Sequence, residues 1–207
     1  MEVSYFTLSV LSAFGLGACP FSVWIGRWVL GKDIRDYGDG NPGAANVFRA
    51  RGRKSGFLAV ILDTAKGIPF VFLAHSFFKL PEAAVMGVAL SAILGHAFSP
   101  LLQLKGGKAI AVTFGALAAL PQHDMLITFA TFMFLGFLFI EINAWTVIFG
   151  ATGSLAYLLA TRGSSWEALF MLCVLTLLVI KHFDELRTVP RIKVKLLAWL
   201  QSRRREL

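Results

Sequence analysis

Long apolar stretches, separated by short polar connections, cover most of the chain. Several approach the roughly 20 residues that a helix needs to cross a bilayer, and the others are shorter. Seven can be drawn, at residues 5–24, 56–78, 83–104, 109–120, 125–142, 144–161 and 168–180. The pattern predicts an all-α, polytopic integral membrane protein of about seven transmembrane helices, in which residues 1–207 form a single membrane domain.

The composition agrees with this fold. Hydrophobic residues make up 57% of the chain, charged residues make up 15%, and the mean hydropathy is +0.69. A soluble domain of this length is rarely so apolar. The N-terminal MEVSYF has no basic residue, so we expect no cleaved signal peptide. Cys19 and Cys173 lie in apolar stretches without His or Cys neighbours at ligand spacing, and we expect no disulfide, metal site or cofactor.

Basic residues concentrate in alternate connections. Seven lie within residues 25–55, two in a KGGK turn and eight from Lys181 onward, whereas the opposite connections hold only Lys79 and Arg162. Because cytoplasmic loops carry the excess of Lys and Arg, the N-terminus is predicted outside and the C-terminus inside. The stretch 109–120 is short enough to be re-entrant. Lys105 and Lys181 both lie inside, however, only if an even number of segments crosses the membrane between them. The four segments drawn there, 109–120 included, satisfy this condition, whereas three would not.

The net charge of +8 raises the question of a nucleic-acid partner. The basic residues line membrane-edge loops, not a separate soluble face with exposed aromatics, so no nucleic acid is expected. Residues 181–207 are predicted to form a basic cytoplasmic C-terminal helix or tail. Within it, PRIKVKLLAWLQSRRREL has the pattern of an amphipathic helix on the membrane surface, or of a plain positively charged anchor.

The stretch GDGNPGAANVFR lies between two apolar segments. Its glycines, Gly38, Gly40 and Gly43, can adopt backbone angles closed to other residues. They can therefore turn successive N–H groups toward phosphate oxygens, while Pro42 stiffens the turn. Arg49 adds a guanidinium that can bind an anion in a bidentate manner. The loop is predicted to hold an anion at the membrane surface.

A second glycine-rich element, KGGK, comprises Lys105, Gly106, Gly107 and Lys108. It opens directly into the apolar run AIAVTFGALAAL, which puts its glycines at the predicted N-terminus of a helix. That end of a helix favours negative charge. Two phosphate-type elements in one chain predict two phosphorylated ligands, or one ligand with two anionic groups.

Several polar residues have both a structural and a functional interpretation. Asp63 and Lys66 lie three apart on one helical face, so they can pair with each other or contact a substrate. His96 precedes a Ser-Pro helix break and is expected to satisfy backbone carbonyls. Asn41 and Asn46 are expected to fix their loop by hydrogen bonds from side chain to backbone.

Four motifs in this order resemble the bacterial acyl-phosphate:glycerol-3-phosphate acyltransferases of the PlsY type: GDGNPGAANVFR, DTAKG at residues 63–67, GHAFSP at residues 95–100, and LKGGKAIAVTFG. The resemblance runs from about residue 19 to residue 115, and more faintly to His182. It implies an enzyme of the bacterial cytoplasmic membrane that transfers a fatty acyl group from acyl phosphate to the 1-hydroxyl of glycerol 3-phosphate, giving lysophosphatidic acid. The two substrates and the membrane lipids would be its partners, its site would face the cytoplasm, and the chain would act as a monomer.

Acyl phosphate is a mixed anhydride that a well-placed hydroxyl can attack directly, so such an enzyme needs no covalent nucleophile. It needs cationic and N–H clamping of phosphates. The predicted catalytic residues are Asp39, Arg49, Lys105 and His182. The predicted substrate-binding residues are Gly38, Gly40, Asn41, Gly43, Asn46, Arg49, Lys66, His96, Lys105, Gly106, Gly107 and Lys108. No His is followed five positions later by Asp, the general-base pair of the other large group of glycerol-phosphate acyltransferases. The resemblance allows the substrate's own phosphate as the base, and a carboxylate near Asp39 is the alternative.

The chain departs from the usual pattern of the family at this predicted site. In the first motif, usually GSGNPGATNVLR, Asp39 replaces the serine and Ala45 the threonine, and in the second, usually KGGKGVAT, Ala109 replaces a glycine. Ala144 stands where the family usually has a serine. In the last motif, usually HRENI, Asp184 and Glu185 replace Glu and Asn. A carboxylate beside a phosphate is repelled unless a cation compensates it. Asp39 is therefore expected to pair with Arg49 or another loop cation, or to accept a hydrogen bond from the glycerol hydroxyl as a general base.

Two other functions compete with acyl transfer. A non-catalytic or altered-specificity paralogue would bind the same phosphorylated ligands. A small transporter of phosphorylated solutes would show internal repeats with matching broken helices, but the glycine-rich loop has no counterpart in the second half of the chain.

Overall fold

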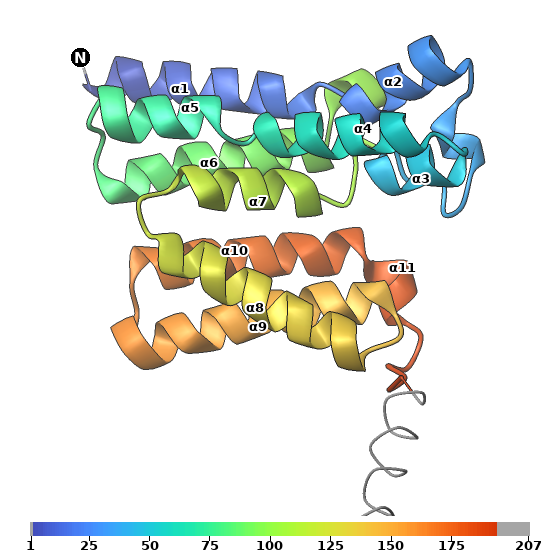
Figure 1. Ribbon diagram of the computed structural model, residues 1–207. Coiled ribbons are helices and arrows are strands. Elements are labelled where there is room, and N and C mark those ends of the chain that lie inside the picture. Colours follow the sequence, from blue (N-terminus) through green and yellow to red (C-terminus); the bar gives the residue numbers. More distant parts are fainter. Residues whose placement is uncertain (1, 194–207) are drawn as a thin grey trace, which may run out of the picture. The chain divides into compact units, whose positions relative to one another are not determined.

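The computed structural model describes residues 2–193 and is helical almost throughout, with one isolated bridge between Ile140 and Ile192 (Figure 1). The all-α fold is thus confirmed. Two compact units divide the chain, residues 1–126 and residues 127–207. Whether they act as one membrane domain stays a prediction, and most of the predicted C-terminal surface helix lies outside the described residues.

The first unit contains seven α-helices within its described part. They are α1 (Glu2–Ala18), α2 (Phe21–Leu30), α3 (Ala44–Arg49), α4 (Arg53–Ala65), α5 (Pro69–Phe72), α6 (Glu82–Ala97) and α7 (Ile110–Ala119). Shorter turns are η1 (Ile34–Asp36), the π-helical η2 (Leu73–Phe77) and η3 (Pro100–Leu102). The second unit is built from α8 (His123–Phe139), which begins just before the boundary, and from α9 (Asn143–Arg162), α10 (Trp166–Lys181) and α11 (Phe183–Leu186).

Four helical segments among the described residues are long and apolar enough to cross a membrane. They are Glu2–Leu30, Arg53–Phe77, Glu82–Leu102 and Asn143–Arg162, while α7 and α8 are shorter apolar helices. Each of the seven apolar stretches in the sequence therefore contains a helix, but the number of crossings stays a prediction.

Two of these stretches are broken earlier than the hydrophobic pattern predicts. Residues 5–24 were expected to form one helix, but α1 ends at Ala18 and α2 begins after Pro20. The apolar stretch 83–104 also runs past a helix end, since α6 ends at Ala97, three residues before Pro100, and the helix break predicted at Ser-Pro is confirmed. Proline lacks a backbone N–H and restricts the residue before it, so it stops a helix that hydropathy alone would continue.

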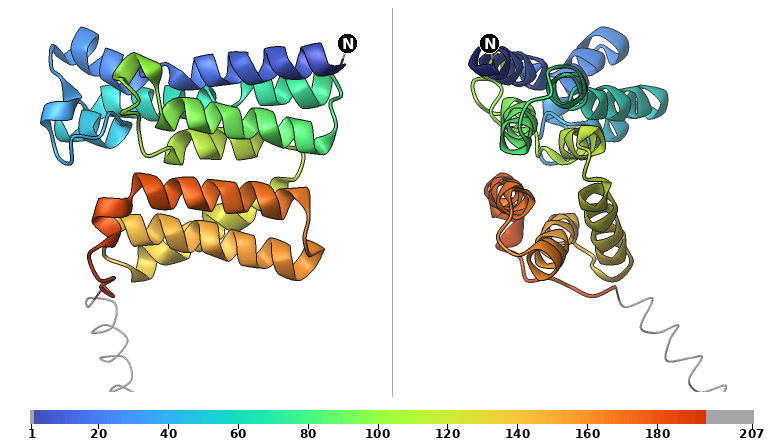
Figure 2. Two further views of the ribbon diagram at one scale, coloured as in Figure 1. Left: turned by 180° about the vertical axis from the view of Figure 1, so that it is seen from behind. Right: turned by 90° about the vertical axis from the view of Figure 1, so that its left-hand side faces the viewer.

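Helices α1 and α6 pack side by side with their backbones in close approach (Figure 2). A methyl group on Gly17 of α1 would collide with an α6 carbonyl, and one on Gly95 of α6 would collide with the α1 backbone. Ser91 Oγ donates a 2.6 Å hydrogen bond to the Val10 carbonyl across this contact. Small residues and interhelical hydroxyl bonds are typical of helix pairs within membranes.

Both glycine-rich elements lie at the same end of the first unit, where α2, α3 and the starts of α4 and α7 meet (Figure 1). A buried apolar cluster supports this end; its members are Val23, Ile25, Ile34, Val47 and Ala59. Because these side chains come from α2, η1, α3 and α4, they fix the loop between η1 and α3 on both of its flanks.

Candidate active site

Two of the three loop glycines adopt the backbone conformation that the sequence predicts. Gly38 and Gly40 have φ of 61° and 70°, in the left-handed region that other residues rarely enter. Gly43 has φ of −114°, so the prediction for its backbone is wrong. A methyl group at Gly43 would press on the side-chain nitrogen of Asn41, which would have to shift.

Asn46 is the buried organiser of the loop. Its Nδ2 donates to the Asn41 carbonyl at 2.9 Å and to Asp39 Oδ1 at 3.0 Å, while its Oδ1 accepts from Arg49 at 2.7 Å. The expected bond from side chain to backbone is present for Asn46. In the described part of the chain the Asn41 side chain makes no such bond and lines a pocket instead.

Asp39 lies between two cations. Its Oδ2 is 2.5 Å from Lys108 Nζ and its Oδ1 is 3.3 Å from Arg49 Nη1, so the expected pairing of this carboxylate is present. Gly38 makes the Arg49 contact possible, since a methyl group at Gly38 would overlap the arginine side chain. Partial burial raises the pKa of Asp39, but the hydrogen bond and charge of Lys108, together with the Asn41 and Asn46 donors, outweigh it and lower that pKa to about 2.

The KGGK element directly precedes α7, as predicted, but its glycines serve packing. The Gly107 N–H donates to the His96 carbonyl at 3.0 Å and therefore does not point toward a ligand. Methyl groups on Gly106 and Gly107 would collide with the His96 and Ala97 backbone and with the His96 ring. His96 thus supports the turn through its carbonyl, and ligand contact by either glycine stays a prediction.

The residue after this turn, Ala109, has a left-handed backbone with φ of 63° and is buried. An L-residue in this region is strained by contact between its Cβ and its own backbone. The family's usual glycine would carry no such strain. The departure at Ala109 therefore acts on the backbone of the turn, in addition to the methyl group that it adds.

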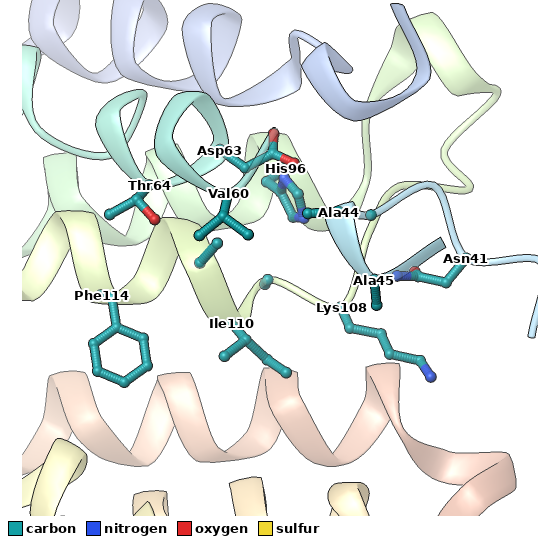
Figure 3. Close-up of a pocket in the computed structure, with 13 residues that line it drawn as sticks. Asn41, Ala44, Ala45, Val60, Asp63, Thr64, His96, Lys108, Ile110 and Phe114 are labelled. Carbon is teal, nitrogen blue, oxygen red and sulfur yellow. The ribbon is translucent and has the colours of Figure 1, made fainter. Parts of the chain in front are cut away.

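A pocket of about 420 Å³ opens beside the loop, between α4 and α7 (Figure 3). Asn41 and Lys108 form its polar end. Val60 of α4 and Ile110 and Phe114 of α7 form an apolar wall. These wall residues were not predicted from the sequence, although the spacing of four between Ile110 and Phe114, which places them on one helix face, was the available signal.

Asp63 and Lys66 pair with each other, which is the structural one of their two predicted roles. Lys66 Nζ lies 2.9 Å from Asp63 Oδ1 and donates to the Cys19 carbonyl at 2.8 Å, and Ser22 Oγ donates to Asp63 Oδ2 at 2.5 Å. Both side chains are almost fully buried. Asp63 reaches the inner wall of the pocket, whereas Lys66 does not line it, and its predicted contact with substrate stays a prediction.

The two KGGK lysines diverge. Lys108 faces Asp39 and the pocket, but Lys105 lines a separate depression with Arg35 and Gly40. Asp39 pairs with Lys108 and Arg49, and the predicted catalytic role of Lys105 stays a prediction.

His182 belongs to the second unit, where it ends α10 and its Nδ1 lies 2.8 Å from the Leu178 carbonyl. Ala144, Asp184 and Glu185 belong to the same unit. Any part that these residues play in a site built on the first unit stays a prediction. Within residues 2–193, no group of three or more His, Cys, Asp or Glu side chains is arranged to hold a metal ion.

The chain matches the family model described as "Glycerol-3-phosphate acyltransferase" over residues 7–191. The chain belongs to this family. A relative called "Glycerol-3-phosphate acyltransferase 1" from Deinococcus radiodurans is 35% identical over 181 residues, which cover 87% of this chain and 89% of the relative. A "Glycerol-3-phosphate acyltransferase" from Anaeromyxobacter sp. strain K is 34% identical over 191 residues, 89% and 93% of the two chains.

Solved structures of the same family share the fold. The crystal structure of PlsY, described as an integral membrane glycerol 3-phosphate acyltransferase in its glycerol 3-phosphate form, matches with a TM-score of 0.77 and 25% identity, covering 88% of this chain and 90% of that one. The lysophosphatidic acid form of PlsY matches with a TM-score of 0.76 and 24% identity. This member of the family is therefore an all-helical integral membrane protein.

Proposed function

We propose that this chain transfers a fatty acyl group from acyl phosphate to the 1-hydroxyl of glycerol 3-phosphate. One observation carries the proposal beyond family membership: Lys108, which lines a pocket with an apolar wall, converges with Arg49 on the single carboxylate of Asp39. An anionic group attached to an aliphatic chain fits such a site, because the cations hold the anion and the wall shields the chain from water.

The reaction needs few protein groups. The 1-hydroxyl oxygen attacks the acyl carbon, the bond from that carbon to the phosphate oxygen breaks, and phosphate leaves with the electron pair. Arg49 and Lys108 would hold the phosphates and stabilise the charge that grows on the leaving oxygen. No covalent intermediate on the protein is required, since both substrates bind at once.

The proton of the attacking hydroxyl would go to a phosphate oxygen of the substrate. A general base is most effective when its pKa is near the working pH, whereas the pKa of Asp39 is lowered to about 2. Asp39 is consequently a weak base at neutral pH, and its two cation contacts favour a pairing role.

The assay that tests this function measures phosphate released from palmitoyl phosphate by purified protein in detergent or lipid. Release should depend on glycerol 3-phosphate and proceed without acyl-CoA or added metal. Asp39→Ser, which restores the family's usual residue, should be assayed beside the parent chain. If neither form turned over substrate while both bound glycerol 3-phosphate, the chain would be a binding paralogue.

The proposed site faces the cytoplasm of a bacterial inner membrane. The support is electrostatic, since the loop, the KGGK turn and the start of α4 bring Arg49, Lys105, Lys108, Arg53 and Lys54 to one end of the first unit.

Cysteine labelling tests this sidedness. In a chain with Cys19 and Cys173 replaced by Ser, Lys54→Cys should react with a membrane-impermeant maleimide only from the cytoplasmic side. His123→Cys, beyond the far end of α7, should react only from outside. Labelling of His123→Cys from the cytoplasm would instead make α7 re-entrant.

A further inference from the structure

The glycine-rich loop separates two depressions. Asn41 and Gly43 line the pocket of the proposed acyl transfer, whereas the alternate residues Gly40 and Pro42 line a second depression of about 300 Å³. One KGGK lysine faces each side, Lys108 the first and Lys105 the second. Successive residues of this short loop therefore contribute to opposite surfaces.

The second depression is cationic. Arg35 and Lys105 line it with the Gln103 amide, and no acidic residue is among its lining residues. Arg35 uses Nε and Nη2 to bind Asp33, which leaves Nη1 for another acceptor. In the part of the chain that the structure describes, the Lys105 ammonium has no hydrogen-bond or ion-pair partner.

The segment that carries Lys105 is held in a strained conformation. Gln103 and Leu104 have φ of 54° and 64°, in the region that bulky residues avoid. Hydrogen bonds fix them there: the Leu104 N–H donates to Ser99 at 2.9 Å and the Lys105 N–H to Leu102 at 3.0 Å. The backbone thus places Lys105 firmly at the rim of the depression.

Apolar side chains flank this cation. Leu101 and Leu104 are 61% and 60% exposed, and Leu101 lines the depression itself. In a membrane protein, a basic residue beside exposed leucines at the end of a helix bundle has the chemistry of a contact with the lipid headgroup layer.

We propose that the depression lined by Arg35 and Lys105 is a second anion site, which binds a phosphate group on the far side of the glycine-rich loop from the acyl-transfer pocket. The chemistry common to its ligands is a phosphate monoester or free phosphate. The source is either the headgroup of an anionic lipid such as phosphatidic acid or a soluble phosphate, and the flanking leucines favour the lipid. This site is independent of the proposed function, because none of its residues lines the pocket.

Binding of a phosphate group to this second site is best measured in a variant whose proposed acyl-transfer site no longer binds phosphate. In an Arg49→Gln, Lys108→Gln chain, native mass spectrometry should show dioleoyl phosphatidic acid bound in preference to phosphatidylcholine, and isothermal titration should measure inorganic phosphate. Lys105→Glu added to this background should weaken binding at least about tenfold, since a charge-assisted contact becomes a repulsion. Lys54→Glu, an equal change of charge on the exposed first turn of α4, should leave the affinity within about twofold.

The two binding measurements distinguish a lipid headgroup from a soluble phosphate. Binding of phosphatidic acid that inorganic phosphate does not displace identifies a lipid site, and equal binding of both identifies a soluble-phosphate site; either result supports the proposal when it depends on Lys105. Arg35→Gln is a second variant, read beside thermal unfolding because it also loosens the contact with Asp33. An equal loss in Lys54→Glu, or no binding in either arm, overturns the proposal, whatever the acyltransferase assay shows.

Discussion

The first unit contains two Asp–Lys pairs in opposite environments. Asp63 and Lys66 lie 2.9 Å apart with 3% and 1% of their side chains exposed, and Asp63 also accepts a hydrogen bond from Ser22 while Lys66 donates to a backbone carbonyl. Asp39 and Lys108 lie 2.5 Å apart with 36% and 20% exposed, and Arg49 adds a second cation. The chemistry of the two pairs is the same, but only the second is open to an incoming anion.

This difference separates structure from function. A buried ion pair has lost its hydration and depends on its partners, so removal of one partner leaves an uncompensated charge. An exposed pair is worth little to stability because water replaces either partner. A phosphate can therefore take the place of the Asp39 carboxylate, whereas nothing outside can replace Asp63.

The largest effect is expected from breaking the buried pair. Lys66→Met should lower the free energy of unfolding by about 3–5 kcal/mol, because Asp63 would be left charged in the interior. Thermal unfolding in detergent measures this, with the exposed Lys54→Met as the control that should change little. Asp63→Asn added to Lys66→Met should recover part of the loss, and a Lys66→Met chain as stable as its control would show that the pair is not structural.

Substitutions at the exposed ion pair should lower activity but leave the stability of the protein unchanged. Arg49→Lys keeps the charge but loses the planar guanidinium, whose Nη1 donates to both Asp39 and Asn46 and whose fork could hold a phosphate, so we expect kcat/KM to fall about 100-fold, of the order seen when one charge-stabilising donor is lost. The unfolding midpoint should remain near that of the parent chain. Lys108→Ala should chiefly raise KM. Activity near the parent level in both variants would refute the cationic clamp.

Asp39→Asn tests whether this carboxylate pairs or acts as a base. Because its pKa is lowered, pairing contributes stability above the unfolded pKa of 3.8, and this contribution is lost as the pH falls toward 2. Between pH 5 and 8 Asp39 stays ionised, so profiles of activity against pH should be parallel for the parent and the variant. The variant should be equally active or up to about fivefold more active, since an exposed ion pair contributes at most about 1 kcal/mol. An acid limb that disappears in Asp39→Asn together with most of the rate would make Asp39 the base.

The smallest effect concerns the turn that positions Lys108. Ala109→Gly should raise the free energy of unfolding by about 1 kcal/mol, because glycine enters the left-handed region without the Cβ strain. Ala111→Gly, within α7, is the matched control and should lower it by about 1 kcal/mol. If both changes destabilised equally, Ala109 would not be strained.

The sequence predicts the helical fold well because each apolar stretch is long and its polar connections are short. It misplaces the end of α1, since hydropathy averages over Pro20, which stops that helix by backbone chemistry, whereas the Ser-Pro pair at Pro100 correctly predicted the break after α6. The pairing of Asp63 with Lys66 was predictable because it is local, at a spacing of three.

Contacts between distant segments were harder to predict. Motif spacing brings Asp39 and Arg49 into one loop, but not Lys108, which follows 69 residues after Asp39. Nor could it separate Lys105 from Lys108, because that divergence depends on the left-handed residues on either side of the KGGK turn, Gln103 before it and Ala109 after it. Sequence gives the residue types of such a site, while backbone conformation decides which of them face the same way.

The backbone contact between α1 and α6 can form only after both helices have been synthesised. The hydroxyl of Ser91 meets the carbonyl of Val10 across 81 residues of sequence. At about 5–20 residues per second, the ribosome needs about 4–16 s to make the chain between them. For that interval the small-residue face of α1, with Gly17 at its end, lacks the helix α6 that covers it in the folded protein. A nascent chain of this protein therefore depends on the insertion machinery, or on lipid, to shield α1 until α6 emerges.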